Sequence, residues 1–166
     1  QLIIEEGKNH NLSHCGSHAM DTMRMESGFL HWGHDISPEE NQYEAGLNFA
    51  ISYKKETNFI GKESISKLKD QKQNRRFIML SLKDSKPGTP LLLHEEPIYL
   101  GDKIIGRTTS GNYSFNYKKN LSFGYVSSTH SNEELSKMDL YIEVAKQKFS
   151  ALVEITPLKD KQARFL

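Results

Sequence analysis

The hydrophobic pattern of the chain changes character at the polar run QKQNRR, residues 71–76. After this run helical periodicity disappears, and seven short apolar segments follow within about 90 residues. These segments are RFIMLSL, PIYL, KIIGRTT, YSF, LSFGYVS, DLYIEVA and KFSALVEIT. The turn signals KPGTP, LGDK, SGN and KKN separate them. Short strands at this spacing are typical of an antiparallel barrel or sandwich, so we place a domain boundary near residues 71–76.

The part of the chain before this boundary mixes helical and strand patterns. Small and apolar residues recur at helical spacing from Gly16 to about Phe29, which predicts a helix. The run QLIIEE at residues 1–6 predicts a strand, and the alternating run LNFAISY at residues 47–53 predicts a half-buried strand. A short helix is expected to start after Gly61. Together with the strand-rich second half, this pattern predicts the α+β class.

Composition excludes several classes of protein. The 22 Lys and Arg residues nearly balance the 21 Asp and Glu residues, so no excess of positive charge points to nucleic acid or a membrane surface. No apolar run approaches the roughly 18 residues of a spanning helix. A single Cys allows no internal disulfide, which fits a reducing compartment. The chain begins at Gln1 without an initiator Met or a signal-peptide pattern, so we expect a portion of a longer protein.

The segment MRMESGFLHWGHDI, residues 23–36, brings the single tryptophan and two histidines close to the carboxylate of Glu26. Potential metal ligands are concentrated in and before it: His10, His14, Cys15, His18, His31 and His34. Their spacing matches no structural zinc pattern, so we predict no metal site. Phe29 and Trp32 follow the predicted helix end, where aromatic residues usually seal a helix against a sheet.

Glu26 is the unusual residue of this segment. It lies near the predicted C-terminus of the helix, where the backbone dipole disfavours a carboxylate. Arg24 is too close in sequence to meet it squarely on one helix face. Two explanations remain open: a distant partner within the fold, or a ligand. A carboxylate accepts two parallel hydrogen bonds from an amino-pyrimidine edge, so a flat ligand of that kind would suit it.

Three longer runs carry a family resemblance: AMDTMRMESGFLHWGHDI, EAGLNFAISYKKETNFIGKESI and EEPIYLGDKIIGRTTSGNYSFNYKKNLSFGYV. In this order and spacing they resemble the folate-binding aminomethyltransferase family, which includes the glycine cleavage T-protein. They look closest to the C-terminal half of dimethylglycine and sarcosine dehydrogenases. The resemblance implies that residues 1–73 are the C-terminal portion of the folate-binding domain, in its ferredoxin-like α/β part. It implies that residues 74–166 form the C-terminal antiparallel Greek-key β-barrel.

The resemblance also implies site residues. Glu26 matches the family's glutamate that hydrogen-bonds the pterin of tetrahydrofolate. Arg24 matches the arginine of the same run, for which pairing across the domain and direct ligand contact both stay open. Lys54 or Lys55 falls where the family places a cation near the glutamate tail of folate, and Lys55 is our candidate. Arg164, close to the end of the chain, is a further candidate. No catalytic residue is expected, because the family's catalytic aspartate lies in an amino-terminal part that these residues do not include.

The implied function is transfer of a one-carbon unit from an amine to tetrahydrofolate, by glycine cleavage or N-methylglycine oxidation. The cofactor is then tetrahydrofolate, with FAD only if an N-terminal dehydrogenase domain is present. The expected partners are an amine-bound one-carbon substrate and, for glycine cleavage, a lipoyl carrier protein. The expected location is the bacterial cytoplasm, or the mitochondrial matrix in a eukaryote. We expect this chain alone to be inactive. The open alternatives are a demethylase of another substrate and a non-catalytic interaction or regulatory protein.

The run TTSGNYSF, residues 108–115, contains Ser-Gly-Asn between two predicted strands. Glycine adopts left-handed backbone angles at little cost, so we predict a hairpin turn at Gly111. A role of this run in shaping a pocket entrance is the alternative.

Overall fold

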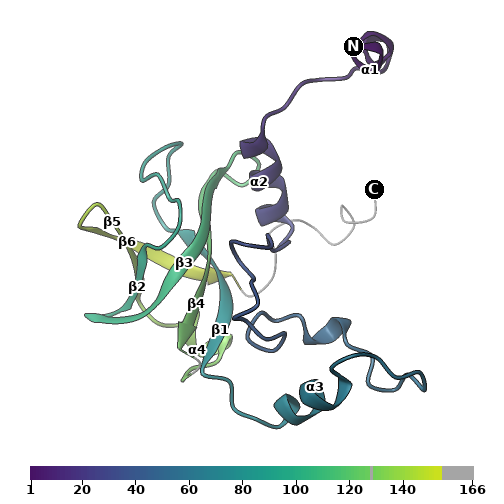
Figure 1. The fold of residues 1–166 in the computed structure, drawn as a ribbon. Helices are drawn as coiled ribbons and strands as arrows, with labels where there is room; N and C mark the ends of the chain where they lie inside the picture. The colour runs from purple at the N-terminus through teal and green to yellow at the C-terminus, as the bar shows by residue number, and fades with distance from the viewer. Residues whose placement is uncertain (128, 155–166) are drawn as a thin grey trace.

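The computed structural model describes residues 1–127 and 129–154. The helices come mainly before the strands (Figure 1). The helical elements are α1 (Leu2–Gly7), α2 (Ser17–Glu26), α3 (Lys62–Lys69) and α4 (Asn132–Leu135), with 3-10 turns at Lys8–His10 and Asn48–Ala50. The strands are β1 (Arg75–Leu82), β2 (Pro97–Leu100), β3 (Lys103–Ser114), β4 (Lys119–Ser127), β5 (Leu140–Val144) and β6 (Gln147–Glu154). The predicted α+β class is confirmed.

The six strands form a closed antiparallel barrel in the order β1-β4-β3-β2-β5-β6. Hairpins join β2 to β3, β3 to β4 and β5 to β6. The β1–β2 and β4–β5 connections each join two strands that are not neighbours in the barrel. Within the described residues, closure gives every strand a hydrogen-bonded neighbour on each side. The predicted antiparallel barrel is therefore confirmed.

Two apolar clusters lie on opposite faces of β1. Alternate residues Ile78, Leu80 and Leu82 point into the barrel interior, where they join a core of buried aliphatic residues from the other strands except β3 and from the connections; the partly buried Ile105 of β3 packs against this core. Met79, on the other face, packs with a cluster that includes Met25 of α2. Helix α2 lies against β3 and β4, and its Met25 also packs with Met79 of β1, so the buried residues of β1 and β4 include side chains of both faces. Figure 1 shows α2 alongside the barrel strands.

Several predicted elements are confirmed, and two are wrong. The helix expected from Gly16 is α2, and the helix expected after Gly61 is α3. Residues 1–6 form α1 rather than a strand, and residues 47–53 form a 3-10 turn rather than a strand. Short apolar runs do not distinguish a strand from a helical segment by periodicity alone. Helix α1 stands away from the barrel, joined to α2 by an extended segment (Figure 1).

The turn predicted at Gly111 is wrong, because β3 runs without interruption from Lys103 to Ser114. The chain reverses at residues 115–118, where Lys118 has a φ of 53°. Gly111 serves a different purpose: a Cβ added there would lie 2.5 Å from the Cβ of Leu92. The glycine thus lets a neighbouring loop approach the strand closely. Along residues 1–127 and 129–154, no helix combines the length and the apolar character needed to cross a membrane.

Candidate functional site

The last turn of α2 places the candidate site against strand β3. The helix ends in a fixed geometry, because Gly28 has a φ of 71° and the Phe29 N–H donates to the Arg24 carbonyl at 2.8 Å. Met25 and Glu26, at the end of the helix, are 1% and 3% exposed. The last turn of α2 therefore places the buried carboxylate of Glu26 against the outer side of the barrel wall.

Glu26 has two hydrogen-bond donors from the end of β3 and the turn after it. The Ser114 hydroxyl donates to Oε1, and the Asn116 amide donates to Oε2 at 2.9 Å. Ser114 Oγ in turn accepts the Tyr117 N–H at 3.1 Å, which orients its own proton towards Glu26. A carboxylate offers about four acceptor positions, so these contacts leave roughly half of the acceptor capacity of Glu26 for a ligand.

Arg24 lies in a second polar cluster beside the first. Its guanidinium donates to Asp35 Oδ2 at 2.7 Å, to Asp21 Oδ1 at 3.0 Å and to Ser110 Oγ at 2.9 Å. Only 15% of the Arg24 side chain is exposed. The structure thus places Arg24 across the junction between α2, the following loop and β3.

Asp35 is the most buried charged residue of this junction, at 1% exposed. Its carboxylate accepts hydrogen bonds from Arg24, the His31 N–H, Thr109 and Ser110. Its backbone carbonyl accepts the Tyr125 hydroxyl at 2.8 Å. Burial raises the pKa of Tyr125 above its usual range, so this hydroxyl stays a donor at neutral pH.

A cavity of about 550 Å³ lies between the end of α2, the loops that follow it and the outer face of β1. Its volume falls within the roughly 300–1,000 Å³ typical of small-molecule sites. Ser27, Phe29, Leu47, Phe77 and Met79 are among its mostly apolar lining. Glu26 borders this region through Ser27, but its carboxylate points to Ser114 and Asn116.

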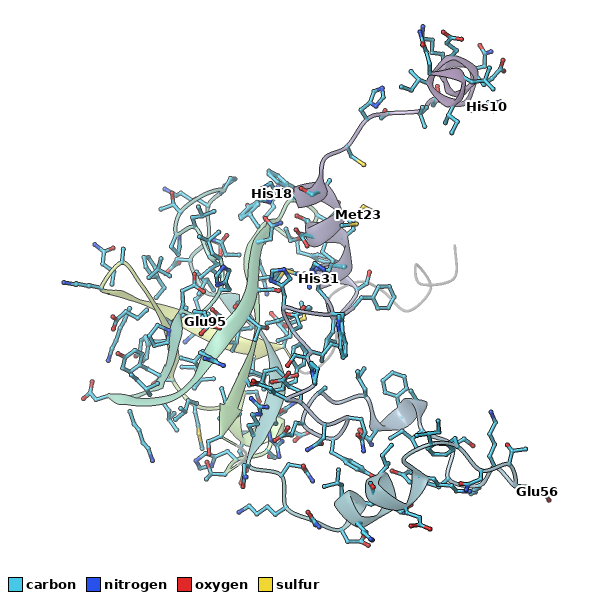
Figure 2. The ribbon with its side chains drawn as sticks, viewed as in Figure 1. His10, His18, Met23, His31, Glu56 and Glu95 are labelled. Carbon is cyan, nitrogen blue, oxygen red and sulfur yellow. The ribbon has the colours of Figure 1, made fainter. Side chains whose placement is uncertain are left out.

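Lys55, the predicted site residue in the loop before α3, is not brought to Glu26. Lys55 is exposed, and its carbonyl accepts a hydrogen bond from the Lys62 ammonium at 3.0 Å. Its neighbour Glu56 lies at the tip of a loop remote from His31 and Met23 (Figure 2). Arg164 lies outside the described residues.

The prediction that Phe29 and Trp32 pack against a sheet is wrong. These side chains are 57% and 65% exposed. The rings of His31 and His34 lie 4.6 Å apart. Across the described part of the chain, no group of three or more His, Cys, Asp or Glu side chains is arranged to hold a metal ion.

Sequence reasoning missed four residues that complete the site: Asp35, Ser110, Ser114 and Asn116. One signal was available, since residues four apart in a strand point to the same face, and Ser110 and Ser114 are four apart. That signal required reading residues 108–114 as strand.

Comparison with known proteins matches most of the chain to the family that the three sequence runs resemble. Residues 1–55 match the family model of the GCVT N-terminal domain. Residues 75–160 match that of the glycine cleavage T-protein C-terminal barrel domain. The chain superposes on the crystal structure of the glycine cleavage system aminomethyltransferase T from Bartonella henselae with a TM-score of 0.81. That match covers 95% of this chain and 43% of that one at 19% identity, and it supports the fold.

Curated relatives are of two kinds. An aminomethyltransferase from Symbiobacterium thermophilum is 34% identical over 79% of this chain and 34% of its own length. A 4-methylaminobutanoate oxidase (formaldehyde-forming) from Paenarthrobacter nicotinovorans is 39% identical over 67% of this chain and 13% of its own. The human mitochondrial dimethylglycine dehydrogenase is 33% identical over 75% of this chain and 14% of its own. The chain spans only about a third or less of these three proteins. The match to the C-terminal barrel domain model, residues 75–160, covers more than half of this chain. The chain therefore belongs to the glycine cleavage T-protein family, as the three sequence runs indicated.

Proposed function

We propose that this chain is part of an enzyme that transfers a one-carbon unit from an amine to tetrahydrofolate. The observation that carries the proposal is the buried carboxylate of Glu26, which keeps spare acceptor capacity at the end of α2. Family membership supports the same reaction, since relatives include aminomethyltransferases and N-methyl-amine oxidases.

The chemistry of the donor set fits a reduced pterin. The amino-pyrimidine edge of tetrahydrofolate presents two parallel N–H donors, and a carboxylate accepts such a pair in one plane. Ser114 and Asn116 fix the plane of the Glu26 carboxylate before the ligand arrives, which reduces the entropy lost on binding. Tetrahydrofolate supplies the N5 and N10 nitrogens that take up the one-carbon unit. Glu26 then holds and orients the ligand and transfers no proton itself.

The proposal also covers the domain bounds, the further ligand contacts and the catalytic residue of the complete protein. We place the end of the folate-binding domain at residues 1–73 and the barrel domain at residues 74–166. Lys55 and Arg164 remain candidates for the glutamate tail of folate, and Arg24 remains a candidate neighbour of the pterin. The family's catalytic aspartate, and FAD in a dehydrogenase version, would come from sequence beyond this chain. The chain alone is then inactive.

The relatives favour two versions of the reaction. Likeness to aminomethyltransferases favours glycine cleavage, for which a lipoyl carrier protein would be the partner. Likeness to the oxidase and the dehydrogenase favours oxidation of an N-methylated amine. We propose a location in the bacterial cytoplasm or the mitochondrial matrix, where either reaction would meet its folate.

The test is calorimetric titration of 5-formyltetrahydrofolate into the complete protein and its Glu26→Gln variant. One charge-assisted hydrogen bond contributes about 1.5–3 kcal/mol, so the variant should bind about ten- to a hundredfold more weakly. Glu44→Gln is the matched control, because Glu44 is also a largely buried glutamate but pairs with Arg75 elsewhere. Equal affinities of the wild type and Glu26→Gln would contradict the assignment of Glu26. Failure of the wild type to bind would contradict the proposed function and favour a non-catalytic interaction protein.

A further inference from the structure

Asp35 and Glu26 are both buried carboxylates against β3, but their acceptor positions are filled to different degrees. Asp35 Oδ2 accepts from Arg24 at 2.7 Å and from the His31 N–H at 2.8 Å. Asp35 Oδ1 accepts from Thr109 at 2.6 Å and from Ser110 at 2.7 Å. Four donors fill the roughly four acceptor positions of a carboxylate. Asp35 therefore has no capacity left for a ligand, whereas Glu26 has.

A β-bulge makes the double hydroxyl contact possible. In the pairing of β3 with β4, Thr108 lies opposite Gly124 and Ser110 lies opposite Phe123, so Thr109 is the extra residue. Neighbouring residues of a regular strand point to opposite faces. A bulge re-aims one of them. Here Thr109 and Ser110, although adjacent, both donate to the same oxygen of Asp35.

The Asp35 cluster joins the segments that determine where Glu26 lies. Arg24, which contacts both Asp35 and Ser110, is two residues before Glu26 in the last turn of α2. The His31 N–H bond fixes the loop that leaves this helix. Ser110 and Ser114 are on the same strand, so the Asp35 cluster and the Glu26 contacts share β3 as their base.

We propose that Asp35 is a positioning residue for Glu26, acting through Arg24 and the bulge hydroxyl of Thr109. The inference rests on the proposed function, since it assigns Glu26 to the ligand. Asp35 fixes the position of the last turn of α2 along β3. In that position the Glu26 carboxylate accepts the hydrogen bonds of Ser114 and Asn116. Loss of the Asp35 charge leaves Arg24 paired with Asp21, which is more exposed, and releases the turn from the strand.

The test uses the complete protein and the variants Asp35→Asn and Thr109→Val. Hydrogen exchange is measured at the backbone amides of residues 22–29, with the β5 and β6 amides as an internal reference. Binding of 5-formyltetrahydrofolate is measured in parallel. Both variants should speed exchange at residues 22–29 but not in β5 and β6, and should weaken binding about tenfold. Thr109→Ser retains the hydroxyl and should restore both properties.

Glu40→Gln is the matched control for Asp35→Asn. Glu40 also pairs with an arginine and accepts a backbone N–H and a serine hydroxyl, and these partners, Arg75 and Ser37, belong to neither α2 nor β3. It should leave exchange at residues 22–29 and folate affinity unchanged. If Asp35→Asn does not fold, Thr109→Val and Thr109→Ser decide the question.

The outcomes separate this inference from the proposed function. Unchanged exchange at residues 22–29 in Thr109→Val overturns the positioning role, whether or not the wild type binds folate. Equal weakening of binding by Glu40→Gln also overturns it. If the wild type does not bind folate, the proposed function fails, and the exchange result still decides whether Asp35 positions Glu26.

Discussion

Met25 is the apolar contact that holds α2 on the barrel, and its truncation gives a sharp test of the packing. Its side chain is 1% exposed and packs with Met79, Leu121 and Phe123. Met25→Ala removes three heavy atoms beyond Cβ, which corresponds to about 2.5 kcal/mol of lost transfer free energy. The cavity left between the helix and the strands adds to this, so we expect a loss of about 3 kcal/mol in the free energy of unfolding.

The same helix supplies a matched control two residues away. Met23 is 59% exposed, so Met23→Ala changes the same atoms without removing packing. We expect it to alter the free energy of unfolding by no more than about 0.5 kcal/mol. Any effect of the substitution on helix propensity is shared by the two variants and cancels in their difference.

The assay is urea unfolding of the two variants and the wild type, followed by circular dichroism and by the fluorescence of Trp32, the single tryptophan. Met25→Ala should lower the midpoint with little change in the m-value, while Met23→Ala should leave the midpoint near that of the wild type. A difference below about 1 kcal/mol between Met25→Ala and Met23→Ala would refute the packing of α2 on β1 and β4.

Two further predictions concern the strand and a helix cap. Gly111→Ala places a methyl group against Leu92 and should lower the free energy of unfolding by about 1–3 kcal/mol. Equal thermal midpoints of the wild type and Gly111→Ala would contradict this. Hydrogen bonds from the Ser131 backbone and side chain lower the pKa of Glu134, so its contribution to stability is present above the ordinary pKa of 4.5 and lost as pH falls through the lowered value. Glu134→Gln should therefore flatten the acid side of the stability profile, and an unchanged profile between pH 3 and 6, roughly, would argue against the cap.

The barrel could be predicted from the sequence because its signals are local. Turn chemistry at Gly101 and short apolar runs such as those of β1 and β4 depend on a few neighbouring residues, and the observed β2–β3 hairpin turns at Gly101 as expected. The first half gave weaker signals. Leu2 and Ile3, read as part of a strand, lie in α1 and are 72% and 79% exposed, so no core face fixes their periodicity.

The candidate site was only half predictable, because its partners are distant in sequence. Glu26 could be singled out from its unfavourable place at a helix end. Asp35 could not be assigned a role, since its hydroxyl donors lie 74 and 75 residues further along the chain. The bulge at Thr109 leaves no mark in the sequence that distinguishes it from a turn. A distant partner and a ligand are the two explanations that the sequence leaves open for Glu26. The structure supplies distant partners, Ser114 and Asn116, and they leave part of the acceptor capacity of the carboxylate unoccupied.

The polarity of residues 108–114 of β3 now has a physical explanation. Ser110, Gly111 and Asn112 predict a turn by their residue types, but a strand that contacts two buried carboxylates needs hydroxyl and amide donors. Burying Asp35 and Glu26 without such donors would cost several kcal/mol for each charge. Arg24 is the single arginine or lysine that the described residues bring to these two carboxylates. Neutral donors provide the rest: the His31 N–H and the side chains of Thr109, Ser110, Ser114 and Asn116. The polar run within β3 is therefore the surface on which the buried acids of α2 and of the loop after it rest, and it forms the base of the candidate site.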